Sequence, residues 1–272
     1  MIDAYLKRIG ISPPDRQDLA ALQRIHLAHL ASIPFENLDI LLGRPIVLDI
    51  ERVIAKLVGQ RRGGYCFEQN RLFLAALDAL GFSADAMAAR VRGGTTALRP
   101  PTHMLLSVRI GDEEWLADVG FGGDGPIGPV PMSGDESIQG AMTYRVASEG
   151  QLRVLQSRAV DEWRDLYAFV PEPVPPIDFE MANWFTSTHP QSPFVRTLTA
   201  QRSTAGVRYV LRYPHYSENR GTDISTREIS RDELLPLLHD VFLIDLPADT
   251  TFSVIDYGVE SASPTCVRAP AD

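Results

Sequence analysis

The stretch Arg61–Asn70, which reads Arg-Arg-Gly-Gly-Tyr-Cys-Phe-Glu-Gln-Asn, constrains the fold of this chain more than any other. Its adjacent glycines allow a close approach of the backbone to a following helix, which the sequence predicts to begin at Cys66. The residues that continue the buried stripe of this helix are Asn70, Phe73, Leu74, Leu77 and Leu80. Free N–H groups and the positive end of the dipole at a helix start favour a thiolate. The stretch therefore indicates a reactive thiol, with a small buried core residue as the alternative.

A hairpin is predicted further along the chain. Residues 102–110 and 114–119 have the composition of two strands, and Gly111-Asp112 has that of a two-residue turn with glycine first. Such a turn places Ile110 opposite Glu113 and so sets the register of every pair beyond it.

The predicted register brings two polar residues together. Leu105 faces Asp118 and His103 faces Gly120, so His103 and Asp118 are diagonal neighbours on one face. A cysteine nucleophile needs a base for its proton and a third group that orients the base. We therefore predict a triad of Cys66, His103 and Asp118. A turn with an odd number of residues would separate the last two, leaving an ordinary histidine and a turn aspartate.

Several further motifs accompany the triad. They are Tyr5-Leu6 with Arg8-Ile9-Gly10, Ile33–Asp39, Thr102-His103-Met104 and Asp118–Gly122, and, in the second half, Asn183-Trp184-Phe185 followed by Ser187, Pro193 and Phe194. Together with the stretch at 61–70, these motifs resemble those of bacterial arylamine N-acetyltransferases, closely in the first half and weakly in the second. The resemblance implies an α+β fold with an N-terminal helical bundle, a central antiparallel β-barrel and a C-terminal α/β lid. It also implies the cysteine catalytic core that papain and the transglutaminases share.

The resemblance also implies a function. Cys66, activated by His103 and Asp118, would take acetyl from acetyl-CoA as a thioester and pass it to the nitrogen of an arylamine or aryl hydrazine. This is a ping-pong reaction of xenobiotic metabolism, with acetyl-CoA as co-substrate, no metal and no tightly bound cofactor. The positions expected to line the acceptor pocket are Phe35, Phe121, Phe194 and Thr102.

Other readings of the same triad are open. A cysteine hydrolase of the papain or transglutaminase type would pass the acyl group to water or a peptide amine. An amide synthase would use a carrier-bound acyl chain, and a non-catalytic binding module would keep only the fold. Glu36 and Arg62 are expected to form a structural pair, and Glu68 to be structural or solvated.

Coenzyme A is polyanionic, whereas this chain carries a formal net charge of −9. Its phosphates therefore need a local patch of positive charge or backbone N–H groups. The candidates for this patch are the backbone of Gly120, Gly122 and Gly123 and the side chains of Arg92 and Arg99. The glycine run lacks the Walker pattern, so an ordinary turn is the alternative. Backbone amides at Cys66 or near Gly120 are candidates for stabilising an oxyanion.

Composition narrows the class of protein. The acidic balance argues against a nucleic-acid partner, which normally meets a basic face. The start of the chain has no signal-peptide core and no apolar run spans a bilayer, so we expect a soluble cytoplasmic protein without a membrane partner. The two cysteines, Cys66 and Cys266, lack metal-site spacing, and Cys266 has no expected role. A monomer and a homodimer are both compatible with the sequence.

The order of predicted elements divides the 272 residues into three parts. Residues 1–84 are mostly helical and carry the cysteine, residues 85–190 form the β-barrel that carries His103 and Asp118, and residues 191–272 form the lid. The strands predicted for the barrel, besides the hairpin, are 88–91, 143–147, 152–157 and 165–170. The lid is predicted to contain a pair of strands at 206–213 and 222–229 and a helix at 231–241 capped by Ser230.

Overall fold

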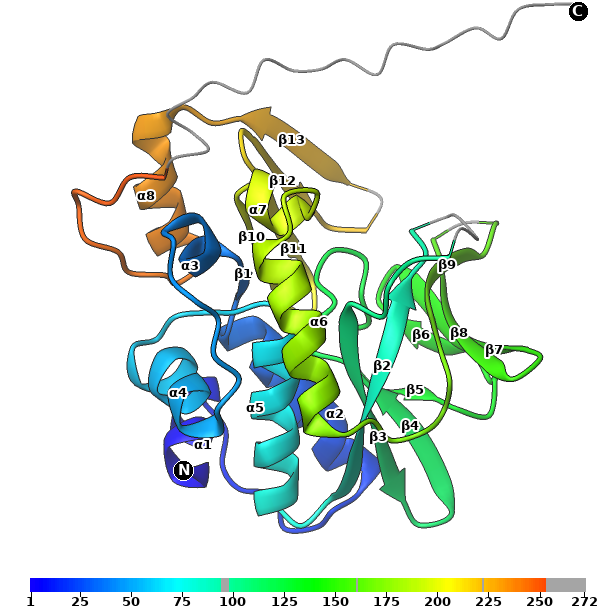
Figure 1. Ribbon diagram of the computed structural model, residues 1–272. Coiled ribbons are helices and arrows are strands. Elements are labelled where there is room, and N and C mark those ends of the chain that lie inside the picture. Colours follow the sequence, from blue (N-terminus) through cyan, green and yellow to red (C-terminus); the bar gives the residue numbers. More distant parts are fainter. Residues whose placement is uncertain (94–97, 160, 222, 253–272) are drawn as a thin grey trace, which may run out of the picture.

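The computed structural model describes residues 1–93, 98–159, 161–221 and 223–252, so Cys266 lies outside the described residues. The fold is α+β, with helices gathered on one side and two antiparallel sheets beside and above them (Figure 1). The helical bundle, the strongly curved sheet and the final sheet follow one another along the chain, as expected. Among the described residues, no helix is long and apolar enough to cross a membrane.

The N-terminal part is helical. Its helices are α1 (Ile2–Ile9), α2 (Leu19–Ser32), α3 (Leu38–Leu41), α4 (Ile50–Ile54) with a π-helical turn (Ala55–Gly59), and α5 (Cys66–Ala79). The side chain of Asp18 accepts the Ala21 N–H at 2.9 Å and so caps α2. The prediction that a helix begins at Cys66 is confirmed.

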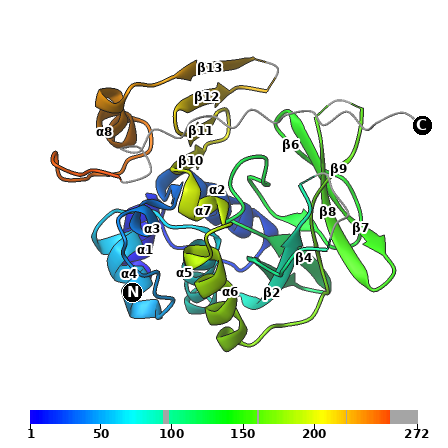
Figure 2. The same cartoon turned by 45° about the horizontal axis from the view of Figure 1, so that its top comes forward.

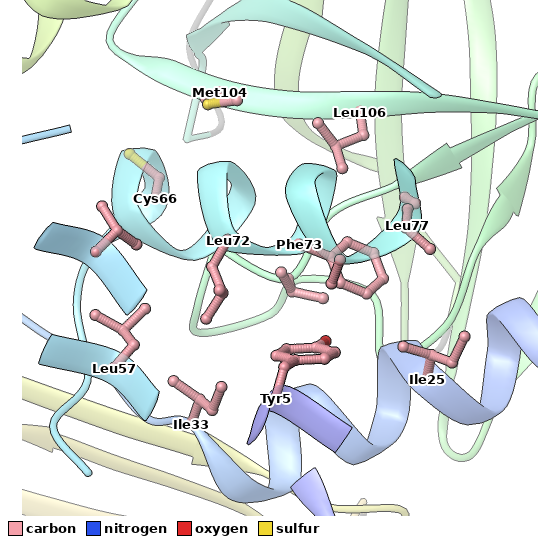
Figure 3. Packing of buried hydrophobic residues seen from close by; sticks show 14 of the residues in the cluster. Tyr5, Ile25, Ile33, Leu57, Cys66, Leu72, Phe73, Leu77, Met104 and Leu106 are labelled. Atoms are coloured by element: carbon pink, nitrogen blue, oxygen red, sulfur yellow. The ribbon is translucent and has the colours of Figure 1, made fainter. Parts of the chain in front are cut away.

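Helix α5 lies at the centre of the largest core. Figure 3 shows Met104 and Leu106 of the curved sheet on one side of it and Tyr5 and Ile25 on the other. These two contacts explain why α5 is buried around most of its circumference. This packing holds the start of α5 between the sheet and the N-terminal helices.

The larger sheet has eight strands, in the order β5-β4-β3-β2-β9-β8-β7-β6, and forms a nearly closed barrel. The strands are β2 (Ser83–Val91), β3 (His103–Ile110), β4 (Glu113–Ala117), β5 (Val130–Pro131), β6 (Ser137–Gln139), β7 (Met142–Glu149), β8 (Leu152–Arg158) and β9 (Arg164–Phe169). Ile110 pairs with Glu113 across the β3–β4 turn, so the predicted register is confirmed. Gly111 has φ 61°, which explains the glycine at the first turn position.

The smaller sheet combines a strand from the N-terminal part of the chain with four strands from the C-terminal part. Its order is β1-β10-β11-β12-β13, from β1 (Phe35–Glu36), β10 (Thr199–Ser203), β11 (Arg208–Arg212), β12 (His215–Asn219) and β13 (Ile224–Glu228). The predicted pairing of 206–213 with 222–229 is wrong, because β12 lies between these strands. Only Tyr216 of β12 is buried, so the strand lacks the apolar alternation by which strands are recognised.

Three more helices complete the fold. Helices α6 (Pro176–Thr188) and α7 (Pro193–Arg196) connect the barrel to the smaller sheet, and α8 (Arg231–Asp240) follows that sheet. Helix α6 lies alongside α5 in both views (Figures 1 and 2), with the rings of Phe67 and Phe179 6.2 Å apart. Ser230 is the N-cap of α8, as predicted.

The two glycines before Cys66 are needed because the chain is close to its neighbours there. A Cβ on Gly63 would lie 2.1 Å from the Pro34 carbonyl oxygen, and one on Gly64 would lie 2.6 Å from a Glu68 carboxylate oxygen. The Pro34 oxygen also accepts the Gln69 side-chain amide at 2.7 Å, which restricts any shift. These contacts hold the segment that leads into α5.

Replacing Gly63 by alanine should therefore lower the free energy of unfolding by about 3 kcal/mol, because the added methyl group overpacks the Pro34 contact. Urea denaturation measures this loss. Gly206→Ala is the matched control, since a Cβ there has no neighbour within 4 Å, and it should change the free energy by less than about 0.5 kcal/mol. Equal losses in the two variants would contradict the proposed cause.

Candidate active site

Cys66 is the first residue of α5, where backbone N–H groups have no acceptor within the helix. Its side chain is almost completely buried, and its Sγ lies 3.7 Å from the Thr102 carbonyl oxygen. The thiol also interacts electrostatically with the His103 imidazole, whose pKa it raises. The start of α5 thus points the thiol at the first residues of β3.

His103 connects the thiol to Asp118. Its Nε2 donates to Asp118 Oδ2 at 2.7 Å, which leaves Nδ1 for the thiol. Burial alone would lower the pKa of His103, but the charge and hydrogen bond of Asp118, together with Cys66, raise it to about 10. The imidazole is therefore held as a cation at neutral pH, next to a group that can become an anion.

Asp118 is buried and accepts four hydrogen bonds. Its Oδ2 accepts from His103 and from the Tyr167 hydroxyl at 2.8 Å, and its Oδ1 accepts from Asn70 Nδ2 and the Gly120 N–H, both at 2.9 Å. Burial raises the pKa of this carboxyl, but the charge of His103 and these hydrogen bonds lower it below its usual value. Asp118 is therefore ionised and fixed in orientation.

Three residues of this arrangement were not predicted. Asn70 also donates to the Met104 carbonyl at 2.6 Å, Tyr167 comes from β9, and His26 of α2 accepts the Asp118 backbone N–H at 3.2 Å. Asn70 stood on the predicted inner stripe of α5, which was a usable signal. Tyr167 and His26 were not detectable, because the pairing of β9 and the packing of α2 are tertiary features.

The predicted pocket aromatics lie in two groups. The Phe121 ring packs edge-on against His103 with centroids 5.2 Å apart and also contacts Tyr167. Phe35 and Phe194 pack together at 5.9 Å, and Phe194 also meets Tyr65 at 5.6 Å. One group therefore borders the histidine and the other borders the residue just before Cys66.

The groups proposed for phosphate binding mostly have partners within the protein. The Gly120 N–H donates to Asp118 and the Gly123 N–H donates to Gln201, and a Cβ on Gly122 would collide with the same Gln201 at 2.6 Å. These glycines serve close packing, and the Gly120 and Gly123 amides have acceptors within the protein, while their contact with a phosphate stays a prediction. The Gly120 amide is unavailable to an oxyanion for the same reason.

The two candidate arginines lie in different surroundings. Arg92 is almost fully buried and pairs with Glu149 at 2.7 Å and Asp165 at 2.8 Å. It holds barrel strands together and cannot face a phosphate without losing these partners. Arg99 is exposed, and its carbonyl accepts a hydrogen bond from Arg90.

The expected structural pair is confirmed. Arg62 Nη2 lies 2.7 Å from Glu36 Oε1, and both side chains are buried. Glu68 is structural rather than solvated, because its carboxylate is buried and contacts Lys56. Among residues 1–93, 98–159, 161–221 and 223–252, no group of three or more His, Cys, Asp or Glu side chains could hold a metal ion.

A buried cysteine, histidine and aspartate at the junction of a helix and a barrel define a thiol enzyme of the papain-like class. Comparison with known proteins identifies the family. A family model described as N-acetyltransferase matches residues 18–251. The chain is 40% identical over 253 residues to arylamine N-acetyltransferase of Mycolicibacterium smegmatis, covering 90% of this chain and 92% of that protein.

Solved structures agree. Arylamine N-acetyltransferase from Salmonella typhimurium superposes with a TM-score of 0.88 at 33% identity, covering 94% of this chain and 96% of that one. The Mycobacterium marinum enzyme in complex with CoA gives a TM-score of 0.84 at 33% identity, covering 90% and 93%. This chain belongs to the arylamine N-acetyltransferase family, and it is an acyltransferase.

Two histidines of α2 have lowered pKa values because they are buried and, within the part of the chain that the structure describes, form no hydrogen bond to a carboxylate. Burial lowers the pKa of His26 from 6.5 to about 4, and that of His29 to about 3. In the unfolded chain both bind protons near pH 6.5, so stability present above that pH is lost as the pH falls toward 4. His103 acts in the opposite direction, since its raised pKa gives stability below pH 6.5 that is lost as the pH rises toward 10.

His26→Gln tests this dependence, because glutamine keeps an acceptor for the Asp118 N–H but does not titrate. The fall in the free energy of unfolding from about pH 7.5 to about pH 5 should be about 2 kcal/mol smaller in the variant than in the wild type. The contribution of His103 is common to both proteins and cancels. Urea denaturation at each pH provides the values, with the exposed His215→Gln as control. A wild-type pH dependence in His26→Gln would show that His26 already binds its proton when folded.

Proposed function

We propose that this protein transfers an acetyl group from acetyl-CoA to the nitrogen of an arylamine or aryl hydrazine through an acetyl-Cys66 thioester, with Cys66, His103 and Asp118 as catalytic residues. The observation that carries the proposal is the position of His103, hydrogen-bonded to Asp118 at 2.7 Å and in electrostatic interaction with the Cys66 thiol. The named substrates of the related proteins support the choice of donor and acceptor.

The first half-reaction loads the enzyme. His103 holds the proton of Cys66, so the thiolate attacks the thioester carbonyl of acetyl-CoA. The carbonyl electrons return as the bond to the CoA sulfur breaks, and His103 can protonate the departing thiolate. The products of this step are acetyl-Cys66, free CoA and a neutral His103.

The second half-reaction transfers the acetyl group. The amine nitrogen attacks the acetyl-Cys66 carbonyl while His103 accepts the proton that the nitrogen loses. The bond to Sγ then breaks, which regenerates the Cys66 thiolate beside the His103 cation. Asp118 keeps the imidazole oriented through both steps and stabilises its charged form.

The acceptor is proposed to bind between the two aromatic groups. Phe121 borders His103, and Phe194 with Phe35 borders Tyr65 at the start of α5, so flat rings lie near two neighbours of the thiol. Aromatic side chains suit flat aromatic amines by stacking. The Thr102 carbonyl, next to Sγ, is proposed to contact the substrate as well.

Three other expectations stay predictions. They are the division into domains at 1–84, 85–190 and 191–272, the cytoplasmic location, and the choice between a monomer and a homodimer.

Intact-protein mass spectrometry after mixing with acetyl-CoA tests the nucleophile. One acetyl adduct should form on the wild type, form equally on Cys266→Ser and be absent from Cys66→Ala. An aromatic amine should then discharge it much faster than water does. Discharge at the same rate by water would favour a hydrolase, and the lack of an adduct on folded protein would favour another acyl donor, as an amide synthase would require.

Asp118→Asn tests the role of Asp118 as the third member of the proposed catalytic triad. The variant removes the charge that stabilises protonated His103, so acetylation of Cys66 should slow by about 1,000-fold or more while the protein stays folded. Stopped-flow or quench measurement of adduct formation provides the rate, and circular dichroism the folding control. Asp124→Asn, an exposed aspartate on the following turn, should keep the wild-type rate. Full activity in Asp118→Asn would remove this residue from the triad.

A further inference from the structure

A second buried ion pair lies at the start of α5, distinct from that of His103 and Asp118. Lys56 Nζ contacts Glu68 Oε1 at 2.8 Å and Asp39 Oδ2 at 2.8 Å. The Glu68 side chain is 3% exposed and that of Lys56 14% exposed. Lys56 lies in the π-helical turn Ala55–Gly59, and the only other lysine in the sequence is Lys7. Burying a charge pair of this kind costs desolvation energy, so its presence indicates a role other than stability.

Glu68 links Lys56 to the segment that carries the thiol. While Oε1 faces Lys56, Oε2 accepts the Tyr65 backbone N–H at 3.2 Å, directly before Cys66. Gly64 lies so close to this carboxylate that a Cβ would come within 2.6 Å of Oε2. The ammonium group therefore fixes a carboxylate that in turn fixes the backbone entering α5.

The charges around Glu68 come from several elements. Lys56 of the π-helical turn is the cation in contact with it, and Glu36 of β1 is a nearby anion. Burial, and to a smaller extent Glu36, raise the pKa of Glu68 above its usual value, while Lys56 and the Tyr65 N–H offset only part of this rise. Arg62 is paired with Glu36, and Arg62 and Arg44 both contact Asp39, so Lys56 is the cation left to balance Glu68.

The charged groups near Cys66 come from the barrel, on the other side of the first turn of α5 from Lys56. His103 of β3 is the cation that contacts the thiol, and Asp118 lies behind it. Glu68 lies on the same first turn of α5 as Cys66, so its negative charge opposes a thiolate unless it is balanced. Without Lys56, the first helical turn would hold two anions near one cation.

We propose that Lys56 is a positioning residue for the nucleophile: its ammonium group neutralises Glu68, which holds the chain at Tyr65 and lets Cys66 carry a negative charge beside His103. This inference rests on the proposed role of Cys66 as nucleophile. Its consequence is that a residue ten positions before Cys66, on a different helix, sets the reactivity of the thiol.

The rate of Cys66 alkylation by iodoacetamide, followed across pH, tests this proposal. All variants carry Cys266→Ser so that Cys66 is the only thiol. The measurement uses neither acetyl-CoA nor an amine, so its outcome is independent of whether the acetyl transfer proposed above takes place. Urea denaturation of each variant separates changes in reactivity from changes in stability.

Removing the charge of Lys56 and removing that of Glu68 should shift the midpoint of the alkylation pH profile in opposite directions. Lys56→Met should slow alkylation at pH 7 about five-fold to ten-fold and move the midpoint of the pH profile up by about one pH unit, because Glu68 is then unbalanced. Glu68→Gln should move the midpoint down, because Lys56 is then in excess. The double variant should return close to the wild type, and Lys7→Met, on the exposed side of α1, should have no effect.

Opposite shifts with restoration in the double variant support the proposal, since loss of packing alone would slow alkylation in every variant. An unchanged profile in folded Lys56→Met would overturn it. So would slower alkylation in Glu68→Gln, or a double variant as slow as Lys56→Met. If Lys56→Met does not fold, the sign of the shift in Glu68→Gln decides alone.

Discussion

The carboxylate of Asp118 is the group on which the arrangement of the site depends. Its donors come from β3 through His103, from β9 through Tyr167, from α5 through Asn70 and from its own turn through Gly120. A buried carboxylate that lost any of them would be left with an unsatisfied acceptor, which is costly. The barrel and α5 are therefore held in one relative position at this group, and the thiol at the start of α5 is placed with them.

The first turn of α5 lies between two buried ion pairs. Asp118 with His103 faces it from the barrel, and Glu68 with Lys56 faces it from the helical side. Replacing a buried ion pair by apolar groups is often neutral or stabilising, whereas removing one partner is strongly destabilising. Stability alone thus gives no reason for either pair. Both are better explained as devices that specify where the chain enters the helix and which charge its first residue can carry.

The sequence predicted the parts of the site that depend on local pattern. The start of α5 at Cys66 followed from helical spacing, and the nearness of His103 to Asp118 followed from a two-residue turn and the alternation of strand side chains. The role of Tyr167 could not be predicted, because this residue approaches Asp118 only through the pairing of β9 with β2. The packing of Gly122 and Gly123 could not be predicted for a related reason: their neighbour Gln201 belongs to β10, a strand that the sequence pattern did not indicate.

The buried histidines differ in charge at neutral pH: His26 and His29 are neutral, whereas His103 is a cation. Their neighbours explain the difference. His29 forms hydrogen bonds with the Tyr5 hydroxyl and the Gln69 amide, and His26 accepts the Asp118 backbone N–H, so among the described residues neither histidine has a hydrogen bond to a carboxylate oxygen that would stabilise a cation. His103 contacts such an oxygen directly. Because His26 Nε2 can accept an N–H only while it is unprotonated, the neutral ring carries its proton on Nδ1. A neutral His26 therefore places no second cation beside Asp118, the carboxylate on which the site is built.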